Sequence, residues 1–300
     1  MSTSSDWNNG QRPPTLDDSV PFTILRPETQ SAPVIFASPH SGNVYPQDFV
    51  DNALLDPIAL RRSEDAFVDE IYDSCLIFGS PLLKANFPRA YLDPNREPYE
   101  LDPAMFESKL PSYVNVDSPR ARAGLGTVAK MVTNGSNIYR DKLDFEEVRS
   151  RIENLYHPYH GALRQLIEET RHQYGTCLLV DCHSMPSIGG PMDNDQGNTR
   201  TDIILGDRFG SSCAPWITDL AQSILEKEGF IVKRNRPYAG GFTTHHYGTP
   251  ADHVHALQIE LNRALYMNEE SVTRLPELED IKKRIESLIK QLCSIDPQRL

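Results

Sequence analysis

The segment Val34-Ile-Phe-Ala-Ser-Pro-His40-Ser-Gly42 joins a short apolar run to a histidine. Its first four residues are apolar and favour β structure, and a proline such as Pro39 is poorly tolerated inside a central strand. The pattern predicts a buried strand that ends at the proline, with His40 on the loop just beyond it. Ligands of open α/β sheets bind at this carboxyl end of the strands. The segment therefore predicts an α/β fold with His40 at its functional edge.

A second apolar run ends in the same way, in Cys177-Leu-Leu-Val-Asp181-Cys-His183-Ser-Met185. Two histidines at the tips of different strands can meet at one edge of a sheet and bind a metal ion. The alternative is that these are two unrelated members of the 9 histidines in the chain, each satisfied by a hydrogen bond. At this point the sequence leaves both interpretations open.

The rest of the chain alternates between strand and helix patterns, without an internal repeat or a linker. We expect a polar, disordered segment at 1–20 and one α/β catalytic domain at 21–300, with a mostly parallel sheet covered on both faces. The residues 240–248 are expected to form a polar loop. Expected strands cover 22–25, 34–38, 81–86, 177–185, 201–205, 230–233 and 255–261, and expected helices cover 58–78, 144–174 (interrupted near Pro158), 212–228 and 277–293.

Composition excludes several classes of protein. The net charge of −12 argues against a general nucleic-acid-binding surface and against attraction to anionic membranes. No run is long enough to span a bilayer, and the first residues lack the basic and apolar parts of a secretory signal. The 5 cysteines are scattered and odd in number, which indicates reduced thiols. These features predict a cytoplasmic protein that contacts neither nucleic acid nor membrane.

A catalytic zinc site commonly combines two histidines and a carboxylate with an open position for water. Glu64 and Asp65, at the start of the predicted helix after the first histidine, are the nearest candidates for the carboxylate. Only one of them can point inward, because neighbours on a helix diverge. An ordinary acidic helix start, where negative charge is favoured, is the alternative.

Glu260 is the other notable acid, because it follows the apolar run His255-Ala-Leu-Gln-Ile. A buried strand tolerates a carboxylate only if that group has a partner or a task. Beside a metal-bound water, Glu260 would be placed to act as a general base. The alternative is a glutamate on an edge strand that faces solvent.

A set of motifs resembles the N-formylglutamate amidohydrolase family when it is taken together and in order, over about residues 33–268. The resemblance implies a fold similar to that of zinc carboxypeptidases and aspartoacylases, which is a three-layer α/β/α sandwich around a mixed sheet of the phosphorylase/hydrolase-like type. The motifs are SPHSG, RRSEDAFVDEIY, FPRAYLDPNREPYELDP, NIYRDKL, YHPYH, DCHSM, YAGGFTTHHYG and QIELNRALY.

The resemblance also implies roles for individual residues. It makes His40 and His183 zinc ligands and Glu260 the general base, and it makes Asn95 and Arg96 a clamp for a substrate carboxylate. The chain departs from the related hydrolases in having Asn43, not glutamate, three residues after the first histidine. The family pattern favours Asp65 as the third ligand, with Glu64 as the alternative.

The implied substrate, N-formyl-L-glutamate, carries two carboxylates and one formamide. Arg96 suits one carboxylate, and Arg89 or Arg140 is expected to hold the other unless these arginines form surface ion pairs. His246, in the expected polar loop, is a candidate for stabilising the oxyanion. His157 and His160 have an i, i+3 spacing that could bind a metal ion, but Pro158 between them disturbs the helix that would align them. A structural role, or one behind the metal ligands, is therefore favoured.

The resemblance implies a zinc-dependent amidohydrolase that releases formate and L-glutamate, as in the last step of one route of histidine breakdown. A related divalent metal could replace zinc. The motifs are also compatible with a hydrolase of another N-acyl amino acid or short peptide, with a serine hydrolase using Ser41 or Ser184, and with a metal-binding domain without activity. The expected partner is a small-molecule N-acyl amino acid, and the oligomeric state stays open.

Overall fold

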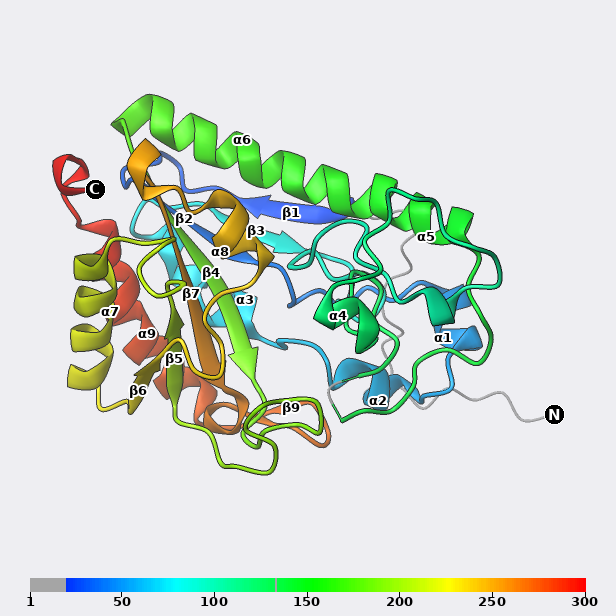
Figure 1. The fold of residues 1–300 in the computed structure, drawn as a ribbon. Coiled ribbons are helices and arrows are strands. Elements are labelled where there is room, and N and C mark those ends of the chain that lie inside the picture. Colours follow the sequence, from blue (N-terminus) through cyan, green and yellow to red (C-terminus); the bar gives the residue numbers. More distant parts are fainter. Residues whose placement is uncertain (1–19, 133) are drawn as a thin grey trace.

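The computed structural model describes residues 20–132 and 134–300, so nearly all of the segment predicted to be disordered lies outside it. Seven strands form one sheet in the order β1-β3-β2-β4-β7-β5-β6 (Figure 1). β1 is antiparallel to β3 and β5 to β7, and the other neighbouring pairs are parallel, which confirms a mixed, mostly parallel sheet. The strands are β1 (Phe22–Leu25), β2 (Val34–Ser38), β3 (Leu82–Ala85), β4 (Cys177–Met185), β5 (Ile203–Gly206), β6 (Val232–Arg234) and β7 (Val254–Asn262), and β8 (Met267–Asn268) pairs with β9 (Thr273–Arg274) in a separate hairpin.

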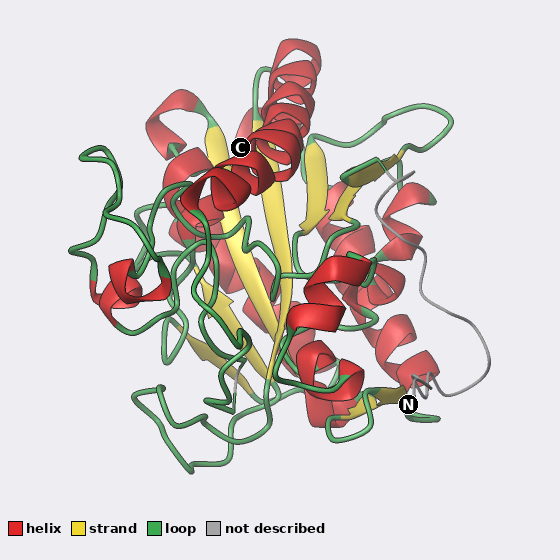
Figure 2. Ribbon diagram, turned by 90° about the vertical axis from the view of Figure 1, so that its right-hand side faces the viewer, coloured by secondary structure: helices red, strands yellow, loops and turns green. Residues whose placement is uncertain are grey.

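Helices cover both faces of the sheet, as Figures 1 and 2 show. Because side chains alternate along a strand, Val34 and Phe36 of β2 pack with α3, α7 and α9, whereas Ile35 and Ala37 pack with α6. The three-layer α/β/α sandwich is thereby confirmed. No helix in the described part of the chain is long and apolar enough to cross a membrane. The helices are α1 (Gln47–Asn52), α2 (Pro57–Arg61), α3 (Val68–Ile71), α4 (Pro119–Arg122), α5 (Phe145–Arg151), α6 (His157–Tyr174), α7 (Pro215–Lys227), α8 (Phe242–Tyr247) and α9 (Leu278–Cys293).

The helix predicted over 144–174 is interrupted, although before Pro158 and not at it. A π-helical turn, Ile152–Tyr156, separates α5 from α6. Pro158 lies just after this turn, as the second residue of α6, so its missing N–H falls where the hydrogen-bond spacing of the continuous helix changes. Gly175 ends α6 in the left-handed conformation, with φ 79°.

Two predicted elements are wrong, and both lie close to the functional edge of the sheet. The helix expected over 58–78 is broken between α2 and α3, where the backbone N–H of Asp65 donates to the carbonyl of His40 at 3.0 Å and Phe67 has a φ of 67°. The loop expected over 240–248 instead contains α8.

The α6-facing side of the central strands changes from apolar to polar toward its carboxyl end. On β4, Leu179 belongs to the core under α6, whereas Asp181 and His183 follow it on the same side. Gln258 and Glu260 lie beside them on β7, in register with Asp181 and His183 respectively. All four polar side chains are buried, so neighbouring strands β4 and β7 place a cluster of polar side chains at the carboxyl end of the sheet.

Candidate active site

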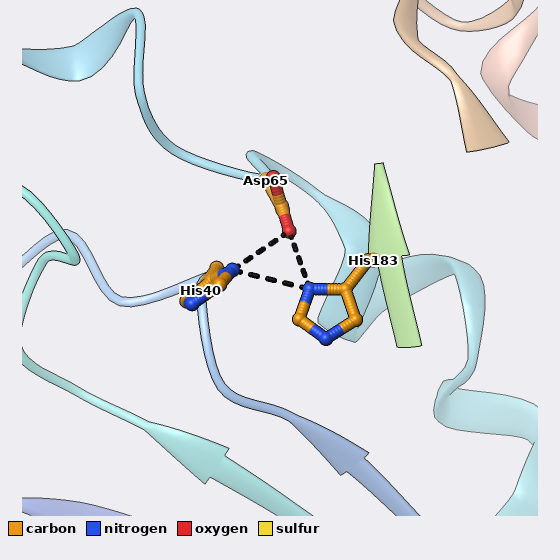
Figure 3. A group of neighbouring side chains, drawn as sticks. All are labelled: His40, Asp65 and His183. Atoms are coloured by element: carbon orange, nitrogen blue, oxygen red, sulfur yellow. Dashed lines mark hydrogen bonds and ion pairs between the residues drawn. The ribbon is translucent and has the colours of Figure 1, made fainter. Parts of the chain in front are cut away.

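Three side chains from separate segments meet at the carboxyl ends of β2 and β4 (Figure 3). His40 lies on the loop after β2, Asp65 on the bend between α2 and α3, and His183 near the end of β4. Oδ2 of Asp65 is 3.2 Å from Nδ1 of His40 and 3.0 Å from Nδ1 of His183, and the two Nδ1 atoms are 3.1 Å apart. The structure therefore brings together the three residues predicted to be metal ligands. We refer to them below as the triad.

Glu64, the alternative ligand, points away from the histidines. Its Oε1 accepts hydrogen bonds from the hydroxyl of Tyr45 at 2.7 Å and from Nε of Arg61 at 3.1 Å. The pKa of Glu64 is raised, because burial raises it more than the charge of Arg61 lowers it. The geometry thus favours Asp65 over Glu64, since the backbone bend at 62–67 turns only Asp65 inward.

Each histidine has a second carboxylate on its other ring nitrogen. Nε2 of His40 is 2.7 Å from Oδ1 of Asp93, and Nε2 of His183 is 3.0 Å from Oδ2 of Asp181. An ionised carboxylate only accepts, so we assign the ring proton to Nε2 and a lone pair to Nδ1 in both rings. Sequence reasoning missed both aspartates. Asp181 could have been predicted, because it lies two residues before His183 on the same strand, and residues i and i+2 of a strand share a face.

Arg263 holds the far side of Asp65. Its Nη2 donates to Oδ1 of Asp65 at 2.9 Å, while Nε donates to Oγ of Ser184 at 3.1 Å. Burial works against ionisation of Asp65, but its contacts with His183 and His40 and the charge of Arg263 hold the pKa of this carboxyl well below its usual range. Oδ2 is thereby left to face the two imidazoles. Sequence reasoning missed Arg263 as well, because nothing in the motif that contains it marks a buried arginine.

Glu260 lies on β7 beside His183. Nε2 of Gln258 donates to Oε1 of Glu260 at 2.7 Å, and Oε1 of Gln258 accepts from the backbone N–H of Gly241 at 2.7 Å. Burial raises the pKa of Glu260, against the opposing effect of His183. A buried carboxylate with one oxygen fixed in this way, next to the triad, has the surroundings of a group that exchanges protons.

Two of the predicted substrate-binding arginines lie at this site. Nη2 of Arg89 donates to Oδ2 of Asp93 at 2.8 Å, and its Nη1 is 3.8 Å from Oδ1 of Asp65. Nε of Arg96 is 3.8 Å from Oδ2 of Asp93 and donates to the carbonyl of Leu125 at 3.1 Å. Burial lowers the pKa of Arg96 to about 10. Both side chains keep some exposure, 21% for Arg89 and 18% for Arg96.

Asn95 is at the site but faces inward. Its Nδ2 lies 3.1 Å from Nε2 of His183 and donates to Oδ2 of Asp181 at 3.5 Å, the oxygen that also accepts from His183. Its Oδ1 accepts from the backbone N–H of Thr243 at 2.8 Å. The side chain is buried. These contacts support His183 and the start of α8. The role of Asn95 in gripping a substrate carboxylate stays a prediction.

Arg140 and His246 lie away from the triad. Arg140 is exposed, and its Nε donates to the carbonyl of Ala53 at 3.2 Å. His246 is exposed on α8, where helical i, i+4 spacing stacks its ring on Phe242 with centroids 4.9 Å apart. Among the described residues, neither has a hydrogen bond or ion pair with the triad. Their roles in binding substrate or stabilising the oxyanion stay predictions, which these contacts do not support.

The donor atoms of the triad fit a divalent metal ion. Two imidazole nitrogens and a carboxylate oxygen lie within 4.8 Å of one another, and all three residues are buried. Zinc–nitrogen bonds of about 2.0–2.1 Å in a tetrahedron separate the ligand atoms by about 3.3 Å. The spacings of the triad come close to this value, and its ligand types are those that zinc prefers.

The sequence profile of the N-formylglutamate amidohydrolase family matches residues 32–267. The chain belongs to this family. It is 28% identical over 263 residues to the N-formylglutamate deformylase of Pseudomonas putida, across 87% of this chain and 90% of that protein. As a member of the family, the chain is a hydrolase.

Solved structures agree with this assignment. The crystal structure of the N-formylglutamate amidohydrolase from Ralstonia eutropha JMP134 superposes with a TM-score of 0.86 at 34% identity, covering 94% of this chain and all of that one (100%). A gene product of Agrobacterium tumefaciens, 20% identical, has a TM-score of 0.65 over 94% of this chain and 98% of its own, and it shows the same fold.

Proposed function

We propose that the chain is a metal-dependent deformylase, which hydrolyses the formamide of N-formyl-L-glutamate to formate and L-glutamate. Family membership supports the substrate. The observation that carries the metal dependence is the convergence of Nδ1 of His40, Nδ1 of His183 and Oδ2 of Asp65 beside the buried Glu260. A place in histidine breakdown follows from the same substrate.

His40, Asp65 and His183 would hold the metal ion, and zinc suits this mixture of imidazole and carboxylate. A bound divalent metal supplies Lewis acidity, which lowers the pKa of a water molecule and polarises an amide carbonyl. Asp93 and Asp181 keep the ring protons of the two histidines on Nε2, so that both Nδ1 lone pairs face the same point.

Glu260 is the proposed general base and acid. Its carboxylate takes a proton from the attacking water and returns it to the leaving amine, so that one water is consumed for each formate and each amine released. The raised pKa of Glu260 favours retention of the proton between these two events. Gln258 holds one carboxylate oxygen in place during both transfers.

Arg89 and Arg96 are proposed to bind the two substrate carboxylates. Both lie near the triad, because each contacts Asp93, which in turn contacts His40, and both are partly exposed. Arg140 and His246 are left out of this assignment, because their contacts lie elsewhere. The contacts of Asn95 favour support of His183 over direct binding of substrate.

The test compares hydrolysis of N-formyl-L-glutamate, N-acetyl-L-glutamate and a short peptide by the wild-type protein and by Glu260→Gln. We expect a preference for the formyl substrate, loss of activity after chelation with recovery on adding zinc, and a fall in kcat of at least about a hundred-fold in the variant. The variant should still bind zinc. A preference for the acetyl substrate would overturn the substrate assignment, and activity that resists chelation would overturn the metal dependence.

A further inference from the structure

The loop 93–96 touches both histidines of the triad from outside. Oδ1 of Asp93 accepts from Nε2 of His40. Asn95 lies against Nε2 of His183 and donates to Asp181, the carboxylate that accepts from that ring. The orientation of both rings therefore depends on where this loop lies. The loop has little regular structure, so its position must be set by whatever binds its backbone.

His160 of α6 binds that backbone between the two contact residues. Its Nε2 is 2.8 Å from the carbonyl of Pro94, and its Nδ1 is 2.8 Å from the hydroxyl of Tyr247 on α8. A carbonyl only accepts, so Nε2 carries the ring proton and Nδ1 accepts from Tyr247. Both ring nitrogens of this buried histidine are thus engaged, one by the loop and one by α8.

Neighbouring residues hold the same loop at further points. The hydroxyl of Tyr156, the last residue of the π-helical turn, donates to the carbonyl of Arg96 at 2.8 Å. The Tyr156 ring packs on His160 with centroids 4.3 Å apart. π-Helical turns occur often at functional sites, where the extra residue redirects side chains. Here the turn ends in Tyr156 and lies four residues before His160, and these are the two side chains that bind the loop.

We propose that His160 is a positioning residue for the metal site, which sets metal affinity and turnover by fixing the loop that orients His40 and His183. This inference rests on the proposed function. It follows from the order of contacts, since Pro94 lies between Asp93 and Asn95 and a shift of its carbonyl moves both. Hydrogen-bond partners behind metal ligands typically change affinity or activity about 10- to 100-fold when they are lost.

The test uses two amide substitutions, each of which can replace only one of the two hydrogen bonds made by the ring nitrogens of His160. In His160→Gln the amide nitrogen can replace Nε2 and donate to Pro94, whereas in His160→Asn the shorter amide can reach only the Tyr247 side. His157→Gln, an exposed histidine of the same helix, is the matched control. Zinc affinity is measured by competition with a chromophoric chelator, amide hydrogen exchange of 93–96 is measured in the metal-free proteins, and kcat and KM are measured separately.

We expect His160→Asn to bind zinc about 10- to 100-fold more weakly, to exchange faster at 93–96 and to lose kcat with little change in KM. His160→Gln should stay within a few-fold of the wild type in all readouts, and His157→Gln should match the wild type. Equal effects of Gln and Asn, or unchanged zinc affinity in His160→Asn, would overturn the inference.

The affinity measurement also separates this inference from the proposed function. Zinc binding without deformylase activity would contradict the proposed substrate, while the ranking of zinc affinities would still decide the role of His160. A wild-type protein without zinc affinity would overturn both.

Discussion

The stability of the protein should fall with acidification in a way that depends on His160. Burial lowers the pKa of His160 from its ordinary 6.5 to about 4, so the folded state keeps this ring neutral where the unfolded chain protonates it. The unfolded state then binds more protons between about pH 4 and 6.5, and the stabilisation present above pH 6.5 is lost as the pH falls through that window. A pKa difference of this size corresponds to about 3 kcal/mol of unfolding free energy, as an upper bound.

The assay is urea unfolding at a series of pH values from 7 to 4, on metal-free wild-type protein, His160→Gln and His157→Gln. Glutamine does not titrate in this range, so the variant should lose up to about 3 kcal/mol less than the wild type between pH 6.5 and 4. Burial also lowers the pKa of His246 and of His255, but their contributions cancel in the comparison. An identical pH dependence in the wild type and His160→Gln would refute the reasoning.

Further substitutions test individual parts of the structure. Asp65→Asn should weaken zinc binding at least about a hundred-fold in a competition titration. Glu64→Gln should bind zinc like the wild type. Its free energy of unfolding in urea should fall by about 1–3 kcal/mol, because Tyr45 and Arg61 lose their charged partner. Gly241→Ala should lower kcat by about ten-fold or more in the formate-release assay, since its Cβ would lie 2.5 Å from the amide of Asn95. Leu288→Ala, in the buried face of α9, should cost about 2–5 kcal/mol in urea unfolding and leave kcat at 25 °C unchanged.

The parts of the fold that could be predicted from the sequence are those fixed by short-range patterns. Apolar runs that end in a proline or a polar residue located β2 and β4, and with them His40 and His183. The choice between Glu64 and Asp65 needed the family pattern. The structure supplies a physical reason for the choice: the Asp65 backbone binds the carbonyl of His40, so that its side chain turns inward.

The parts that were missed depend on contacts between distant segments. Asp93 and Arg263 are ordinary polar residues of their motifs, and only the assembled fold places them on His40 and Asp65. The segment 240–248 was expected to be a loop because of its two glycines, whereas the residues after them form α8, in which His246 stacks on Phe242 at i, i+4. Tertiary packing decides whether such a segment forms a helix and where its side chains lie, and the spacing of residues in the sequence does not show that packing.

The triad joins parts of the chain that are far apart along it, since 143 residues separate His40 from His183. Closing so long a segment has an entropic cost, which the β2–β4 pairing and the rest of the native packing offset. Under the proposed function, no early folding intermediate or fragment would hold the metal, whereas the native chain would be stabilised by it through mass action. The ion would then act as a removable cross-link between the first and the middle third of the chain. Metal supply would therefore control the resistance of the protein to proteolysis as well as its rate of turnover.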